Sequence, residues 1–390
     1  MKLLKSKALF LISLVVLASC SPKQENTNTI EMSVLNIDLT SDFEETELAI
    51  NEIVEDIKLI QLESNEDILL AYFSGFIGDK YIVAKDEDKL LYFTADGKFL
   101  KTIAIRGEGP NEFRRIDTWV VDEQEKTFLY HDIGQDGIFK FNLETGEFEE
   151  SIPFETKGSL SGMLLMGDAT IALMAHETAS YDFLYRTQSF DGKILNQIKN
   201  ELEVNHKKAA YNSPYFAKYQ NSIILLQRSN SDSIYQIKGD EMKPFLLFGL
   251  KKIKKDGNKT LGSSASLAHI YKDKFYLRKY DYHTEVSTNS VSLTMSDYEH
   301  FVFDNSDNST VKFSKVYCEY EGIKFPISYL NIASNGKLIR TFDAFEVKEL
   351  IEEALEEGNL TEKQKSYWEE INSNIDDTDN PIIITGKAKV

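Results

Sequence analysis

The sequence predicts an all-β fold, a six-bladed β-propeller, on three observations. Short runs rich in Ile, Val, Leu, Phe and Tyr are separated by Gly, Asp and Asn residues, which is the pattern of strands joined by turns. Helical periodicity is nearly absent before residue 344. Turn glycines recur at positions 97, 146, 192 and 239, in steps of 49, 46 and 47 residues. A period of this size that holds four short strands is typical of propeller blades.

The N-terminus has the features of an exported lipoprotein. Three lysines lie in the first seven residues, and the apolar stretch from Ala8 to Leu17 is too short to span a bilayer. Leu17-Ala18-Ser19-Cys20 resembles a lipobox. We therefore expect residues 1–19 to be a signal peptide, Cys20 to be acylated, and residues 20–47 to be a flexible tether. The alternative is an ordinary cleaved signal peptide followed by a chance cysteine.

The propeller is expected to occupy residues 48–390 and to divide into successive blades. Strands of the first blade are predicted near residues 72–77, 80–84, 90–94 and 99–105. Those of the second are predicted near 116–121, 127–131, 137–141 and 147–152. The third and fourth blades span about 160–199 and 213–249, and the fifth begins near 265 with an insert at 281–297. Asp-Gly and Thr-Gly turns join many of these strands, because glycine adopts the positive φ that tight hairpins need.

The sixth blade is expected to be interrupted by a helical insert, residues 343–376. Asp343 can cap a first helix with one apolar stripe, and Gly358 ends it. Thr361-x-x-Gln364 is a capping box for a second helix. Strands at 327–333, 337–342 and 381–385 leave this blade one strand short, and residues 57–62 supply a closing strand. We favour a position of the insert over the channel mouth, the alternative being packing on the rim.

Three segments resemble the six-bladed β-propeller lipoproteins of Bacteroidetes, which are related to NHL-repeat propellers. These segments are Ile53-Val54-Glu55-Asp56-Ile57 with Ile60-Gln61-Leu62-Glu63, Arg106-Gly107-Glu108-Gly109-Pro110-Asn111-Glu112-Phe113, and Asp379-Asn380-Pro381. The resemblance covers nearly all of residues 48–388. It implies the fold and a location at the bacterial outer membrane, facing either the periplasm or the outside, and it implies little chemistry.

Composition restricts the partners that the chain can have. The formal net charge is −19, and such a surface repels phosphate backbones, so we expect no nucleic-acid binding. Cys318 has no partner once Cys20 is acylated, and we interpret it as a buried thiol. Trp119, Phe128 and Tyr130 alternate on strands and are interpreted as packing between blades rather than as a sugar-binding platform.

Polar residues at the ends of the second strands, and in the first loop between blades, are expected to ring one mouth of the channel. This candidate ligand-binding face comprises Lys85, Arg106, Glu108, Asn111, Glu112, His131, Asp132, His176, Glu177, Arg228 and Lys279. The alternative is that each of these residues is an ordinary solvated loop residue.

No motif of a known catalytic class stands out. A Gly-x-Ser-x-Gly element is absent, and the glycines around Glu108 lack the lysine and helix of a phosphate-binding loop. The six histidines show no ligand spacing, so we expect neither a metal nor another cofactor. The favoured function is non-catalytic binding or scaffolding of a glycan, peptide or partner protein. The alternative is a channel-centred lyase or hydrolase of the NHL-like type, with or without a metal, that uses His131, His176 and nearby acids.

Overall fold

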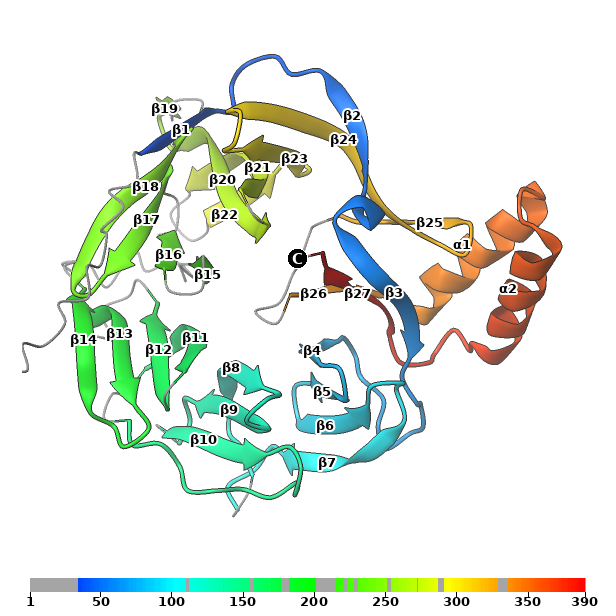
Figure 1. The fold of residues 1–390 in the computed structure, drawn as a ribbon, viewed down its shortest axis with the longest axis horizontal. Helices are drawn as coiled ribbons and strands as arrows, with labels where there is room; N and C mark the ends of the chain where they lie inside the picture. The colour runs from blue at the N-terminus through cyan, green and yellow to red at the C-terminus, as the bar shows by residue number, and fades with distance from the viewer. Residues whose placement is uncertain are drawn as a thin grey trace, which may run out of the picture. The chain divides into compact units, whose positions relative to one another are not determined.

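The strands of the chain form six sheets arranged around a common centre (Figure 1). The structure is a computed structural model that describes residues 34–109, 112–135, 137–154, 158–167, 169–176, 182–200, 215–219, 223–227, 231–250, 254–271, 273–286, 291–328 and 336–389. Within these residues the fold is all-β with two helices, in a β-propeller arrangement. The predicted fold class is confirmed at this level.

Three blades follow one another along the first half of the ring. The first contains β4 (Ser74–Ile77), β5 (Tyr81–Lys85), β6 (Lys89–Thr94) and β7 (Phe99–Ile105). The second contains β8 (Ile116–Asp122), β9 (Thr127–Asp132) and β10 (Gly137–Asn142). The strand expected at 147–152 reaches the second blade only through isolated bridges at Phe148 and Ile152. The third contains β11 (Leu160–Gly167), β12 (Thr170–Ala175), β13 (Phe183–Ser189) and β14 (Ile194–Lys199).

The fourth and fifth blades continue in the same order. The fourth contains β15 (Tyr215–Tyr219), β16 (Ile223–Gln227), β17 (Ser233–Lys238) and β18 (Glu241–Gly249). The fifth contains β19 (Lys254–Asp256), β20 (Lys259–Tyr271), β21 (Lys274–Val286), β22 (Val291–Met295), β23 (Glu299–Asp304), β24 (Ser309–Tyr320) and β25 (Ile323–Pro326). The expected insert at 281–297 is therefore largely strand, because β21 extends to Val286 and β22 pairs with that extension (Figure 1).

The N-terminal belt, residues 34–61, joins three sheets. β1 (Leu35–Asp38) pairs in parallel with β18, and β2 (Glu45–Ala49) pairs in parallel with β24. A 3₁₀ turn, Ile50–Glu52, then leads to β3 (Val54–Gln61). Ile37 and Leu39 are buried, so their apolar surface is removed from water. The expectation of a tether through residue 47 is corrected by these contacts: the folded part already includes residue 34.

Both ends of the described chain meet in the last sheet. β27 (Ile382–Ala388) lies between β26 (Lys337–Phe342) and β3, with Ile383 opposite Ile60. The predicted closing strand is thereby confirmed. The strand expected at 327–333 lies mostly outside the described residues, and this sheet has three described strands. The ring thus consists of five blades built from successive segments and one three-stranded closing sheet, which differs from the predicted six blades of four strands.

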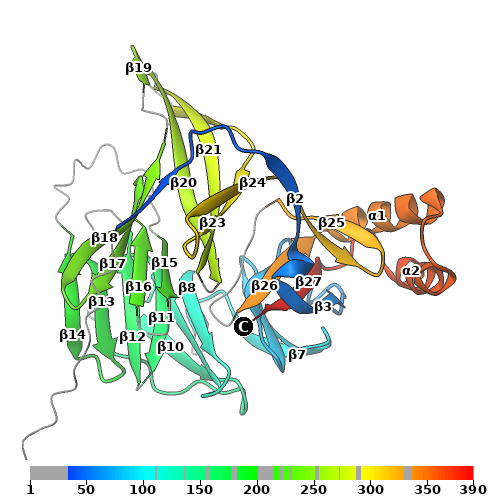
Figure 2. The ribbon, with the colours of Figure 1, turned by 45° about the horizontal axis from the view of Figure 1, so that its top comes forward.

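The helical insert packs at the periphery of the ring. α1 (Ala344–Glu357) and α2 (Glu362–Asn374) begin at capping boxes on Asp343 and Thr361, as predicted. The buried Trp368 of α2 donates its indole N–H to the carbonyl of Glu321, at 2.9 Å, beside β25. Figures 1 and 2 place both helices outside the sheets, away from the common centre. The expectation that the insert covers the channel mouth is therefore wrong, because its apolar stripe lies against the outer strands of the fifth blade.

Local details agree with the turn and core assignments. Gly97, Gly146, Gly192 and Gly239 all have positive φ values, between 62° and 89°. Tyr130 is buried and stacks on Phe139, with ring centroids 5.3 Å apart, as expected for packing aromatics. Cys318 is buried, and burial raises the pKa of its thiol to about 12. Over the ranges described, neither helix is long and apolar enough to cross a bilayer.

Candidate ligand-binding cavity at the channel mouth

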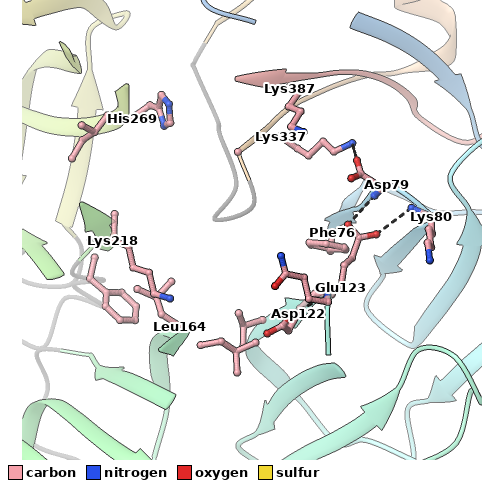
Figure 3. A pocket seen from close by; sticks show the side chains of 18 residues that line it. Phe76, Asp79, Lys80, Asp122, Glu123, Leu164, Lys218, His269, Lys337 and Lys387 are labelled. Carbon is pink, nitrogen blue, oxygen red and sulfur yellow. Dashed lines mark hydrogen bonds and ion pairs between the residues drawn. The ribbon is translucent and has the colours of Figure 1, made fainter. Parts of the chain in front are cut away.

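A cavity of about 860 Å³ opens at the common centre of the ring (Figure 3). Its lining comes from every sheet, because the ends of β4, β8, β11, β15, β20, β26 and β27 converge there. The lining residues are Phe76, Asp79, Lys80, Val120, Val121, Asp122, Glu123, Gln124, Leu164, Leu165, Phe216, Ala217, Lys218, His269, Ile270, Gly336, Lys337 and Lys387. A cavity of this size is in the range of small-molecule and oligomer sites.

The acidic side chains of the lining are occupied by donors of the protein itself. Asp79 accepts an ion pair from Lys337 at 2.5 Å, and this hydrogen bond is the main cause that holds the pKa of Asp79 below its usual value. Glu123 accepts the backbone N–H groups of Asp79 and Lys80, at 2.9 and 3.1 Å. Asp122 accepts two backbone N–H groups of its own turn, at 2.9 and 3.1 Å.

Three lysines of the lining stand in contrast to these acids. Among the described residues, the ammonium groups of Lys80, Lys218 and Lys387 have no carboxylate oxygen within 4.0 Å. Burial lowers the pKa of Lys218, and the charge of Asp122 partly opposes that shift. In Figure 3, Lys218 lies across the cavity from Lys80 and Lys387. Lysines without a close carboxylate partner among the described residues therefore lie on two sides of the cavity.

His269 of β20 adds a neutral polar group to the same lining. Burial lowers its pKa to about 4, so the ring is uncharged at neutral pH. Its Nε2 atom is buried and has no hydrogen-bond partner in the described part of the chain. The ring lies 6.1 Å from that of Tyr276, measured between centroids. Because this nitrogen has no exposed surface, it does not offer a hydrogen bond to a ligand in the cavity.

The predicted ligand-binding face lies at the other end of the strands. In the first blade, Ser74 pairs with Lys85, whereas Ile77 pairs with Ile82, next to the turn that carries Asp79 and Lys80. Lys85 therefore sits at the opposite end of this hairpin from the cavity. Lys85 is half-buried, and burial lowers its pKa. None of the eight predicted residues that the structure describes lines the cavity.

His131 and Asp132 are buried completely and serve the framework. The Nδ1 atom of His131 is 2.7 Å from an Asp117 oxygen, and the other Asp117 oxygen accepts Ser159 Oγ and Leu160 N from the next blade. Asp132 accepts the backbone N–H groups of residues 114, 115 and 134, at 2.7 to 2.9 Å. A side chain with no exposed surface cannot contact a ligand, so these two assignments are corrected.

Lys279 is also committed to internal contacts. It is buried and forms an ion pair with Glu299, which in turn pairs with Lys312 at 2.7 Å. Lys312 also pairs with Glu45 of the N-terminal belt, at 2.8 Å. The predicted role of Lys279 at a mouth is replaced by a role in attaching the belt to the fifth blade.

The other described residues of the predicted set lie in loops or beside strand ends. Glu112 accepts the backbone N–H of Gly109 at 2.6 Å, and Glu108 lies 3.6 Å from Arg114 in an exposed ion pair. Arg106 bridges to Phe113 through the backbone, and the backbone N–H of His176 donates to Ser159 at 3.5 Å. Asn111, Glu177 and Arg228 lie outside the described residues. The described members of this set do not come together as a single site.

Sequence reasoning missed the residues that line the cavity. Asp79 with Lys80, and Asp122 with Glu123, lie at or just after the ends of the first strands of successive blades, and this repetition is visible in the sequence. Lys337 and Lys387 carried no comparable signal, because only the pairing of β26 with β27 brings them side by side. Within the described ranges, no group of three or more His, Cys, Asp or Glu side chains is placed to hold a metal ion.

Comparison with known proteins shows the family of this chain. Residues 34–387 match the family described as "Domain of unknown function (DUF4934)", and the chain belongs to that family. No curated protein matches the sequence. The structure is similar to that of a Bacteroides fragilis protein described provisionally as exported, with 14% identity and a TM-score of 0.56 over 92% of this chain and 100% of that one. A DUF4221 member from Bacteroides vulgatus is more distant, with 12% identity and a TM-score of 0.46 over 86% and 96%. At such identities the likeness shows the fold alone.

Proposed function

We propose that this chain is an exported lipoprotein of the bacterial outer membrane whose propeller binds a ligand without catalysis. The observation that carries the proposal is the cavity of about 860 Å³ to which every sheet contributes side chains. Ring-shaped folds place ligands where loops and strand ends converge, and here that point is the channel mouth. The lipobox at Cys20 and the likeness to a protein described as exported support the location.

The proposal also includes a six-bladed propeller that is related to NHL-repeat proteins. The three-stranded closing sheet acts as a sixth blade, since it completes the circle between the fifth blade and the first. The segment from Arg106 to Phe113 supports a relation to NHL-repeat propellers. The rival function, a lyase or hydrolase built on His131 and His176, has no support in the geometry, because His131 is completely buried.

The site is tested by blocking each end of the ring in turn. The full-length chain is screened against glycans and peptides, and the ligand found is titrated against two variants. Ala217→Trp places a large ring at the cavity, whereas Ala71→Trp places the same ring on an exposed loop beside Asp86, at the opposite end. We expect binding to be lost only in Ala217→Trp. Loss only in Ala71→Trp would move the site to the other face.

The anchor is tested independently of the ligand. Cys20→Ala removes the thiol that the lipobox presents for acylation, so the variant is expected to leave the detergent phase. The mass of the mature N-terminus checks the same point. Unchanged partitioning of the variant would remove the anchor from the proposal.

A further inference from the structure

The cavity carries positive charge on a molecule that is acidic as a whole. Its lining holds four lysines, Lys80, Lys218, Lys337 and Lys387, against the three acids Asp79, Asp122 and Glu123. The complete chain has a formal net charge of −19. Since charge of one sign in a concave site attracts ligands of the other sign, the mouth differs from its surroundings in what it attracts.

The three acids of the lining offset three of the four lysine charges, which leaves one formal positive charge at the mouth, but only one of these acids is ion-paired with a lysine of the lining. Asp79 is paired with Lys337, and the carboxylate of Glu123 receives two backbone N–H groups of the Asp79 turn. Three lysines then remain without an acidic partner among the residues that the structure describes: Lys80, Lys218 and Lys387. Such ammonium groups have three donors each and no acceptor.

We propose that the channel mouth binds an acidic oligosaccharide, whose carboxylate or sulfate groups pair with Lys80, Lys218 and Lys387. The inference rests on the proposed function and names the ligand class of that same site. Lys218 faces the other two lysines across the cavity, so the ligand carries at least two anionic groups that are separated along its length (Figure 3).

The exposed chemistry of the lining suits a sugar. Phe76, Val120, Leu164 and Phe216 are at most 9% exposed, so the apolar surface that a ligand meets comes from partly exposed residues such as Leu165, Ala217 and Ile270. Ammonium, carboxylate and amide groups share the lining with this apolar surface, a mixture that suits the hydroxyl groups and the C–H faces of a sugar ring. Carboxylates accept hydrogen bonds from hydroxyl groups and lysines donate to them, which suits a polyhydroxylated ligand.

The size of the ligand follows from the cavity and from electrostatics. An acidic globular partner would bring its surface against a chain of the same sign, and that repulsion is screened only beyond about 8 Å at physiological ionic strength. A narrow acidic oligomer that enters the mouth approaches the lysines without bringing a second acidic protein surface against the first. An oligosaccharide of a few residues matches the cavity of about 860 Å³.

The test compares two triple variants of the full-length chain. Lys80→Gln/Lys218→Gln/Lys387→Gln removes the uncommitted charges of the mouth. Lys193→Gln/Lys238→Gln/Lys363→Gln removes the same charge from exposed positions outside the cavity and serves as the matched control. The probes are a tetramer of galacturonic acid, a sulfated galactose tetramer, a neutral galactose tetramer and a tetraglutamate peptide. Affinities are measured by calorimetry at low and physiological ionic strength.

We expect one or both acidic tetramers to bind the parent and the control equally, and the mouth variant at least tenfold more weakly. The two acidic tetramers distinguish a carboxylate from a sulfate ligand. Binding is also expected to weaken with salt, because the contacts are ionic.

The other outcomes overturn the inference in distinguishable ways. If the neutral tetramer binds as tightly as the acidic ones, or if the mouth variant binds them unchanged, the lysines do not select the ligand. If the peptide binds more tightly than either acidic sugar, the ligand class is wrong. If no probe binds, the inference fails. The proposed function survives any of these results as long as Ala217→Trp abolishes the binding of a ligand found in the wider screen.

Discussion

Acidic side chains accept backbone N–H groups at both ends of the strands, but those at the end away from the cavity are more deeply buried, and the cavity end also presents lysines that have no carboxylate partner among the described residues. Asp86 and Asp132 lie at the end of the second strand of successive blades, and both accept backbone N–H groups from the chain that enters their blade. Asn380 does the same for Leu70 and is also completely buried. Around the cavity, Lys80 and Lys218 have no such internal partner in the described residues.

This difference shows that the hydrogen bonds of a polar residue in a propeller loop must be known before that residue can be assigned to ligand binding. A buried carboxylate that accepts several N–H groups is stable because those donors replace water. An ammonium group without a carboxylate partner is stable because solvent still reaches it. The two situations look alike in the sequence and have opposite meanings for ligand binding.

The largest expected effect comes from the end where the acids are buried. Asp132→Ala leaves three backbone N–H groups without their acceptor, and we expect a loss of about 3 kcal/mol or more in the free energy of unfolding. Asp122→Ala removes an acceptor of two N–H groups in a half-buried turn, where water can replace it, and should cost about 1 kcal/mol. Urea unfolding measures both values. Equal losses in the two variants would contradict the contrast between the two ends.

Much of this fold could be predicted because its determinants are local. The turn glycines, the apolar runs and the two capping boxes each depend on residues close in sequence. The closing strand was predictable because the last blade lacked a partner for its edge. The number of blades and the start of the folded part were harder to predict. β1 and β2 contain too few apolar residues to be recognised as strands before their parallel partners are known.

The site could not be predicted from the same signals. His131 with Asp132 appeared as a functional pair because the residue types suit catalysis, yet their environment is the interior between two blades. Lys218 and Lys387 are far apart in the sequence, and only ring closure brings them to one cavity. Burial and convergence are properties of the assembled ring, so residue type alone could not reveal them.

A fall in pH is expected to lower the free energy of unfolding by an intermediate amount, through His269 in the cavity wall. Burial lowers the pKa of His269 to about 4 from a usual value of 6.5, so protonation favours the unfolded chain. The contribution of the neutral ring to stability is complete above pH 6.5 and is lost as the pH falls toward 4. His269→Gln should therefore reduce the drop in unfolding free energy between pH 7 and pH 5 by about 1–2 kcal/mol.

The control for this titration is a lining residue without an ionisable group. Gln124→Ala changes a side chain of the cavity lining and should leave the drop between the two pH values as it is in the parent. Thermal or urea unfolding at both pH values gives the comparison. An unchanged drop in His269→Gln would mean that the ring is already accessible to protons and solvent in the folded protein.

The smallest expected effect concerns the ion pair at the rim of the cavity. Asp79 is largely exposed, so its 2.5 Å contact with Lys337 should contribute less than about 1 kcal/mol to stability, as surface pairs do. Lys337→Gln removes the main cause of the low pKa of Asp79, and that pKa should rise toward its usual value of 3.8. Because the pKa of Asp79 is lowered in the folded state, the small stabilisation is present at neutral pH. It is lost as the pH falls through the pKa of Asp79 in the folded protein. NMR titration of the Asp79 carboxyl group measures the shift, and urea unfolding measures the stability.

Lys243→Gln, which breaks an exposed pair with Glu241 away from the cavity, is the matched control and should leave the Asp79 titration unchanged. A loss of several kcal/mol in Lys337→Gln would show that this rim is part of the framework, and the contrast between the two ends of the ring would then no longer hold.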